Sequence, residues 1–152
     1  ITGDLPMDGH AELTMNGTLW VGGRVEVAEK ARVKLAPEYD IKSGMIVADG
    51  PITLMDNAQG LGSGRAESYL GFISTYASGT AISIQDAFQA DVLYAHNEEV
   101  LIENTSDLKQ VTGYRLHLIN NAELTYETGL AHIDFSGGPS GNWVVRRWRE
   151  VE

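Results

Sequence analysis

Residues 45–58 have the sequence MIVADGPITLMDNA, and this stretch contains the pattern that decides the fold. Two short apolar runs are separated by an Ala-Asp-Gly turn signal, and an Asn-Ala step follows the second run. In the second run Ile52 and Leu54 occupy alternate positions, as expected of a half-buried β-strand. Short alternating runs bounded by Gly, Asn and Asp are typical of all-β proteins.

The same unit recurs along the chain. Other units begin near Leu19, Leu93 and Leu116, and a more divergent one begins near Phe72. The period is roughly 20–27 residues, which is in the range of solenoid coils. One coil cannot bury its own apolar face, so such coils must stack. The pattern predicts an all-β, right-handed parallel β-solenoid (β-helix) of about five or six short coils. We expect four small residues at its corners or in its tight interior: Ala31, Ala58, Ala87 and Ala122.

Two alternatives to the solenoid remain open at the sequence level. A β-sandwich with hairpins of unequal length leaves a similar trace. Residues 26–36 and 85–95 also fit a helix, although Val27 and Val33 alternate in the first window and favour strands. We expect one domain over residues 1–152, with a long loop at the Gly-rich residues 60–64.

Composition excludes several classes of function. The chain of 152 residues has no cysteine, which excludes disulfides, thiolate metal sites and cysteine nucleophiles. Its net charge of −10 repels phosphate backbones, so we expect no nucleic-acid partner. No apolar run approaches the length of about 18 residues needed for a transmembrane segment. The chain starts at Ile1 without a signal-like pattern, so we expect either a removed signal or a fragment.

Motifs for enzymatic chemistry are missing, and we predict no catalytic residues, cofactor or metal. The sequence contains no H-E-x-x-H, no G-x-S-x-G and no phosphate-binding loop. The pairs His10 with Asp8 and His132 with Asp134 are interpreted as ordinary polar surface.

A small surface site is nevertheless suggested by residues 114–118. If Leu116 and Leu118 point inward, Arg115 and His117 project outward together. Solenoid-fold polysaccharide lyases use basic and acidic residues on such a face, but five or six coils are few for a substrate groove.

The C-terminal residues differ in composition from the rest. A Gly-Gly-Pro-Ser-Gly loop leads into a final strand that mixes aromatic and basic residues. We predict that residues 137–152 form a capping segment, because an open solenoid end needs protection against edge-to-edge pairing. Its capping or interaction residues are Trp143, Trp148, Arg146 and Arg147.

Residues 92–152 resemble the C-terminal region of PilX-type type IV pilus assembly proteins. The resemblance rests on VLYAHNEEVLIENTSDLKQVTG, on YRLHLINNAELTYETGL, and on the Gly-Pro-Ser-Gly loop before the tryptophan-bearing end. It implies an exported domain, extracellular or at the cell surface, that contacts pilus or cell-surface proteins. Pilin-like proteins carry an N-terminal apolar helix that these residues do not match. The stacked pattern is also distantly similar to bactofilins, which polymerise through β-helical cores.

From the pattern and the resemblance together, we expect a non-enzymatic structural or adhesive module. The alternative is a carbohydrate-binding or polysaccharide-cleaving β-helix with glycan partners. A third alternative is a cytosolic, bactofilin-like polymer, and a homo-oligomer is compatible with each of these roles.

Overall fold

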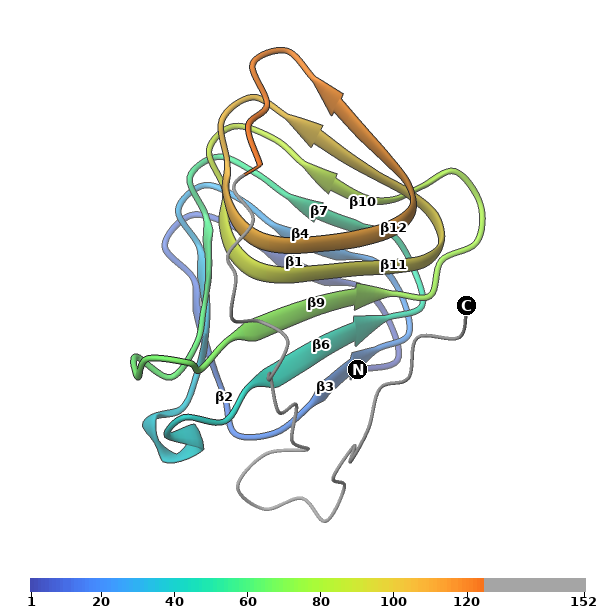
Figure 1. Ribbon diagram of the computed structural model, residues 1–152. Coiled ribbons are helices and arrows are strands. Elements are labelled where there is room, and N and C mark those ends of the chain that lie inside the picture. The colour runs from blue at the N-terminus through green and yellow to red at the C-terminus, as the bar shows by residue number, and fades with distance from the viewer. Residues whose placement is uncertain (125–152) are drawn as a thin grey trace, which may run out of the picture.

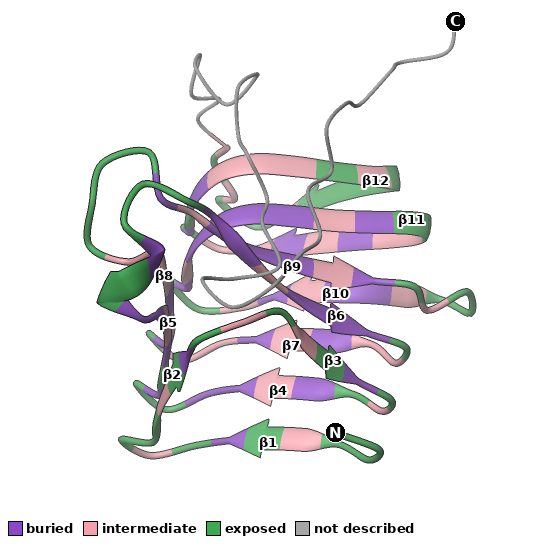
Figure 2. Cartoon of the chain, turned by 90° about the horizontal axis from the view of Figure 1, so that it is seen from below, coloured by how far each residue is buried: buried purple, intermediate pink, exposed green. Residues whose placement is uncertain are grey.

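The structure is a computed structural model, and it describes residues 1–124. Its strands all pair in parallel and belong to one sheet, which winds into a solenoid with three faces (Figure 1). Coil after coil lies in the same orientation along the stack (Figure 2). The predicted parallel β-solenoid is therefore confirmed. The sandwich alternative, which needs antiparallel hairpins, is wrong for residues 1–124.

Each face is built from short strands that recur once per coil. Face 1 contains β1 (Leu5–Met7), β4 (Val25–Val27), β7 (Ile52–Leu54) and β10 (Thr80–Ile84). Face 2 contains β2 (Glu12–Met15), β5 (Arg32–Leu35) and β8 (Gln59–Leu61). Face 3 contains β3 (Leu19–Val21), β6 (Gly44–Ala48) and β9 (Leu70–Ser74). The two windows that also fitted a helix thus contain strands, and the only helix among the described residues is the short 3-10 turn η1 (Pro37–Tyr39).

Two long strands complete the stack by bending around its corners. β11 (Gln89–Glu103) pairs first with β8, then with β9 and finally with β10, so it passes over faces 2, 3 and 1 in turn. β12 (Asp107–Ile119) follows β11 in parallel along the same path. Because these strands turn corners without loops, the coils they form are the shortest in the described chain.

The coil lengths follow from one in-register column on face 1. The column consists of Leu5, Val25, Ile52, Ile82, Val100 and Leu116. Successive members are 20, 27, 30, 18 and 16 residues apart, so residues 1–124 contain five complete coils and the start of a sixth. The predicted period of 20–27 residues holds only for the first two coils. The third is longer because residues 75–79 form a longer corner between β9 and β10 than residues 49–51 form in the preceding coil, and the last two are shorter. Residues 62–69 form the loop that was expected near residues 60–64, and the preceding coil has a loop of the same length at residues 36–43.

The interior is filled by the inward column residues and by two aromatic rings. Phe72 and Phe88 are fully buried and meet edge to face, with ring centroids 6.1 Å apart. A Cβ atom at Gly60 would lie 2.5 Å from the Phe72 ring, so glycine is required where that ring lies against face 2. Large and small residues thus alternate between facing positions, as in a close-packed core.

The corner between faces 1 and 2 uses backbone with positive φ. Two consecutive residues adopt it at Glu29 and Lys30, at Asp56 and Asn57, and at Asp86 and Ala87. The left-handed region favours Gly, Asn and Asp, which explains the recurring Asn/Asp-Ala step in the sequence.

All four predicted small residues lie at or next to that corner, as the sequence suggested. Ala31 and Ala58 are fully buried just after the corner, and Ala122 packs partly buried against the core. Ala87 occupies an exposed left-handed position of the corner itself, with φ of 59°. In residues 1–124 we find no helix long and apolar enough to cross a membrane.

Candidate functional site

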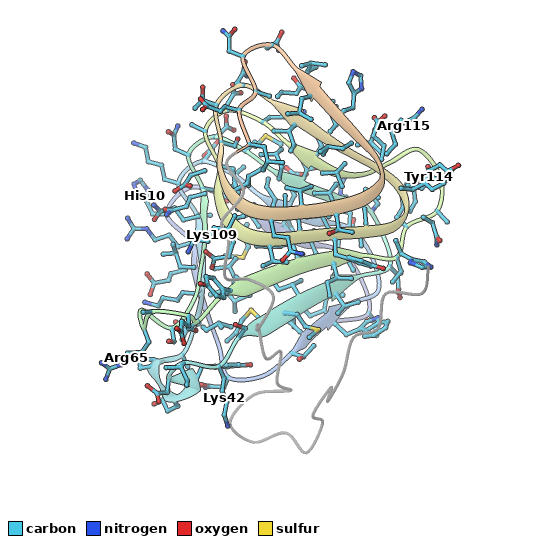
Figure 3. All side chains as sticks on the ribbon, viewed as in Figure 1. His10, Lys42, Arg65, Lys109, Tyr114 and Arg115 are labelled. Carbon is cyan, nitrogen blue, oxygen red and sulfur yellow. The ribbon has the colours of Figure 1, made fainter. Side chains whose placement is uncertain are left out.

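The predicted surface residues Arg115 and His117 meet at one carboxylate. Arg115 Nε lies 2.8 Å from Glu99 Oε2, and His117 Nδ1 lies 3.7 Å from the same oxygen. On the preceding coil, Thr80 Oγ1 donates a hydrogen bond of 3.3 Å to Glu99 Oε1. Figure 3 shows Arg115 on the outside of the stack. The sequence did not single out Glu99 as the centre of this group, because the parallel register that places it beside Arg115 is a long-range feature.

This arrangement is that of an ion pair that joins two coils. The Glu99 side chain is only 13% exposed, whereas those of Arg115 and His117 are 67% and 53% exposed. The carboxylate is therefore enclosed by its partners and is not presented to solvent. A base or nucleophile needs an accessible oxygen, so this geometry suits cross-linking of coils better than catalysis.

Another side-chain pair, Tyr94 and His96, lies at the corner where β11 turns from face 3 to face 1. The Tyr94 hydroxyl and His96 Nδ1 are 3.1 Å apart, and the two rings are stacked with centroids 6.2 Å apart. His10, the first of the predicted surface histidines, is exposed on the turn before β2. Within residues 1–124 no three His, Asp or Glu side chains come together in a way that would hold a metal ion.

One buried carboxylate, Asp91, was missed by the sequence analysis. It is 8% exposed, and its Oδ2 accepts a hydrogen bond of 3.0 Å from the backbone N–H of Leu70. Lys109 Nζ lies 3.0 Å from Asp91 Oδ1 and also sits 4.7 Å from the centre of the Tyr69 ring. Burial raises the pKa of Asp91, against the lowering effect of these two partners. The Asp91 carboxylate thus fixes the point where loop 62–69 meets β9 to β11 of the next coil.

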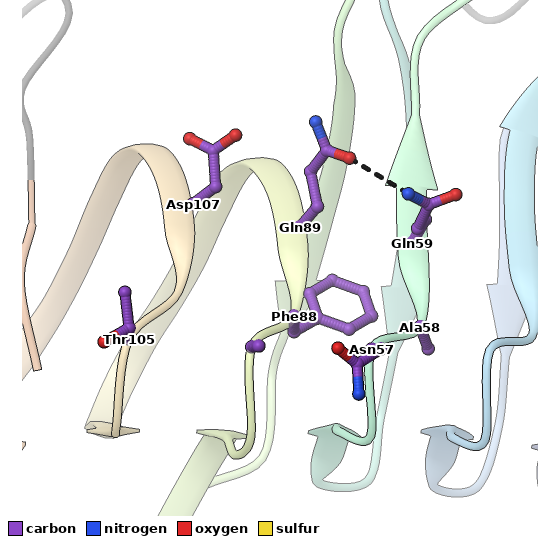
Figure 4. A pocket seen from close by; sticks show the side chains of 8 residues that line it. Asn57, Ala58, Gln59, Phe88, Gln89, Thr105 and Asp107 are labelled. Atoms are coloured by element: carbon purple, nitrogen blue, oxygen red, sulfur yellow. Dashed lines mark hydrogen bonds between the residues drawn. The ribbon is translucent and has the colours of Figure 1, made fainter.

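A hollow of about 350 Å³ lies on the corner between faces 1 and 2 (Figure 4). Its walls come from three consecutive coils and carry amide, hydroxyl and carboxylate groups. Gln59 Nε2 donates a hydrogen bond of 3.2 Å to Gln89 Oε1 across one side. The other polar lining residues are Asn57, Thr105 and Asp107. The hollow is of a size that accommodates a small ligand or a sugar unit.

The predicted capping residues Trp143, Trp148, Arg146 and Arg147 lie outside the described residues, as do His132 and Asp134. At the C-terminal end of the described stack, Leu116 and Leu118 are each 41% exposed. These two leucines continue inward columns of face 1, so the last described coil leaves part of its apolar interior open.

Comparison of the chain with protein-family models, with curated proteins and with solved structures gives no match. The geometry of residues 1–124 and the sequence therefore carry the functional argument alone.

Proposed function

We propose that the chain is a non-enzymatic structural or adhesive module of an exported protein, associated with a pilus or the cell surface. The observation that carries the proposal is the use of charged side chains to join coils. Five Lys or Arg side chains pair with a carboxylate one turn of the solenoid away: Arg24 with Asp4, Lys34 with Glu12, Arg65 with Asp40, Lys109 with Asp91 and Arg115 with Glu99.

Two amide side chains also bond to a neighbouring coil. Gln59 bonds to Gln89 on the next coil, and Asn104 Nδ2 donates to Asp86 Oδ1 at 2.9 Å, again one coil away. Each exposed pair contributes little alone, about 0.2–1 kcal/mol. Repeated along the stack, they add to the backbone ladder and favour a rigid body. A rigid surface of this kind suits a module that transmits force or presents a contact face.

The resemblance of residues 92–152 to PilX-type proteins supports an exported location for this module. The test uses the cysteine-free chain, expressed in its host cell from the complete gene with Ser83→Cys on the outer side of face 1. A membrane-impermeant maleimide is expected to label this variant on intact cells, and the label is expected in the sheared pilus or surface fraction. Labelling only after lysis contradicts the exported location and favours the cytosolic, bactofilin-like polymer.

A structural role also predicts how substitution of Arg115 and His117, the partners of Glu99 on β12, affects the cell. Arg115→Ala together with His117→Ala removes the two partners of Glu99 on β12 but leaves the Thr80 hydrogen bond and the backbone ladder intact. Surface adhesion or pilus assembly by cells carrying this double variant is expected to stay near wild type. Loss of that phenotype with the fold retained, shown by an unchanged circular dichroism spectrum, contradicts a purely structural use of these side chains.

A second candidate function, glycan binding, is favoured by the hollow beside Gln59 and Gln89. Amide and carboxylate groups on a concave surface can hydrogen-bond to sugar hydroxyls. Gln89→Ala removes the group that bridges two coils there. A glycan array with no response at high concentration of the wild-type chain rejects this function, whereas binding that Gln89→Ala abolishes supports it.

A further inference from the structure

One residue with a short side chain lies in the middle of the hollow on the corner between faces 1 and 2. Ala87 occupies the second left-handed position of this corner, where the preceding coil has Asn57. On the following coil the register places Thr105 at the corresponding position. The side chains of Asn57 and Thr105 are exposed at the hollow (Figure 4). Between them the methyl group of Ala87 leaves a gap.

A left-handed backbone is unfavourable for alanine. Ala87 has φ of 59°, a conformation that brings the β-carbon of an L-residue too close to the following carbonyl oxygen. Asn and Asp adopt it more readily, because their short polar side chains hydrogen-bond locally. Asparagine, which the preceding coil has at position 57, would therefore suit the backbone at position 87 better. Unfavourable backbone conformations cluster at ligand sites, and this one is at the residue that keeps the hollow open.

The polar groups around the gap match the hydroxyl groups of a sugar. Asn57, Gln59 and Gln89 each carry an amide that can both donate and accept hydrogen bonds, and the Thr105 hydroxyl can do the same. Sugar hydroxyls also donate and accept. The hydrogen bond from Gln59 to Gln89 fixes two of the amides in place. A ligand that is rich in hydroxyl groups therefore fits the lining better than an apolar one.

Charge restricts which sugars fit. Asp107 is the only charged residue among the described residues that line the hollow. Asp56 and Asp86 add two carboxylates at the first left-handed position of the same corner. The coil before the hollow carries Lys30 and Arg32, but neither residue lines it. Because carboxylates repel an acidic sugar, the lining favours a neutral one.

From these observations we propose that Ala87 determines ligand specificity: its methyl group leaves room in the hollow for one unit of a neutral polysaccharide, although alanine makes the corner less stable. The inference rests on glycan binding, the second candidate function above. It does not depend on the structural role or on export.

Three substitutions separate ligand binding from stability. Ala87→Asn fills the gap and suits the left-handed backbone, whereas Ala87→Gly suits the same backbone and keeps the gap. Lys30→Asn is the matched control, since Lys30 has φ of 70° at the equivalent position and does not line the hollow. We expect Ala87→Asn and Lys30→Asn to raise the midpoint of urea denaturation above that of wild type.

Affinity electrophoresis of the full chain, in gels that contain a soluble β-glucan, mannan or galactan, measures binding. Polygalacturonate is the acidic counterpart. We expect at least one neutral polymer to retard wild type, Ala87→Gly and Lys30→Asn, and polygalacturonate to retard none of them. Ala87→Asn is expected to bind the neutral polymer at least about tenfold more weakly than wild type, because its side chain occupies the gap.

Three results overturn the inference while glycan binding stands. Ala87→Asn is retarded as strongly as wild type, Ala87→Gly loses binding although the gap is kept, or wild type is retarded by polygalacturonate alone. A urea midpoint of Ala87→Asn below that of wild type also contradicts it, because alanine would then suit the corner. If none of the four polymers retards wild type, glycan binding at the hollow is rejected, and the inference with it.

Discussion

At the scale of single residues, two polar groups are buried although burial is unfavourable for them, and substitutions can measure the effect on stability. Tyr39 is fully buried under β6, and its hydroxyl has no hydrogen-bond partner among the described residues. Burial raises the pKa of this phenol, so the group stays neutral. Asp91 is the corresponding case for a carboxylate, although it has two partners. Neither was identifiable from the sequence, because burial of a Tyr or Asp depends on which loop packs over which coil.

Tyr39→Phe is expected to raise the free energy of unfolding by about 1 kcal/mol, because a buried hydroxyl without a partner carries its full desolvation penalty. Urea denaturation followed by circular dichroism measures the change. Tyr94→Phe is the matched control, since the Tyr94 hydroxyl has a partner in His96 and its loss is expected to be neutral or slightly destabilising. A lower stability for Tyr39→Phe than for wild type would show that the hydroxyl has a partner after all.

Asp91→Asn is expected to change the pH dependence of stability. The Asp91 pKa is raised in the folded state, so its contribution to stability is fully present below the unfolded pKa and is lost as pH rises through the folded pKa. The asparagine variant keeps a carbonyl oxygen for the Leu70 N–H and does not titrate. The free energy of unfolding of wild type relative to Asp91→Asn should therefore fall as pH rises above the ordinary aspartate pKa of about 4. A relative rise over that range contradicts the assignment.

At the scale of elements, alternation of apolar residues specified the strands, and turn residues specified the corners. Val25 with Val27 and Ile52 with Leu54 were assigned to strands from the sequence, and both pairs point inward on face 1. The sequence did not show which strands pair with each other, because loops of different length separate equivalent strands. The long bent strands β11 and β12 were missed for a related reason: their corners lack the turn signals that mark the others.

Glycine at the corner between faces 3 and 1 gives an element-scale prediction. A Cβ atom at Gly50 would lie 2.7 Å from the carbonyl carbon of Gly23 on the coil before it. Gly50→Ala is therefore expected to lower the free energy of unfolding by about 1–3 kcal/mol, because backbone must move apart. Gly3→Ala is the control, since nothing lies within 4 Å of a Cβ atom there. Equal urea midpoints for the two variants would contradict the close approach of the coils.

At the scale of the whole molecule, stability comes from stacking, so position along the stack matters. Ile52 is fully buried with a coil on each side, whereas Leu5 lies in the first described coil and is only partly buried. Ile52→Ala is expected to lower the free energy of unfolding by about 2–5 kcal/mol. Leu5→Ala is expected to lower it clearly less, because Leu5 is the first member of its column and has a described neighbour on one side only. Similar costs in urea denaturation would argue against a stack with distinct ends.

The sequence predicted the solenoid and its coil number, but the candidate sites needed the structure. Arg115 and His117 were found as neighbours on one strand, while Glu99 joins them only through the pairing of β11 with β12. The outward-facing apolar residues of β6 could likewise not be identified from the sequence. In the sequence, inward and outward apolar residues of β6, such as Ile46 and Val47, form one continuous run. Only the register separates residues that face the core from those that face outward.

The most direct test of the parallel stack is a set of backbone nuclear Overhauser contacts in the intact chain. The account predicts contacts between the amide and Hα protons of neighbouring coils, in register from Val25 to Ile52 and from Ile52 to Ile82. It predicts no close Hα–Hα contacts between β4 and β5, which follow each other in the sequence. Strong Hα–Hα contacts between those two strands, as in an antiparallel hairpin, would contradict the solenoid and every proposal built on it.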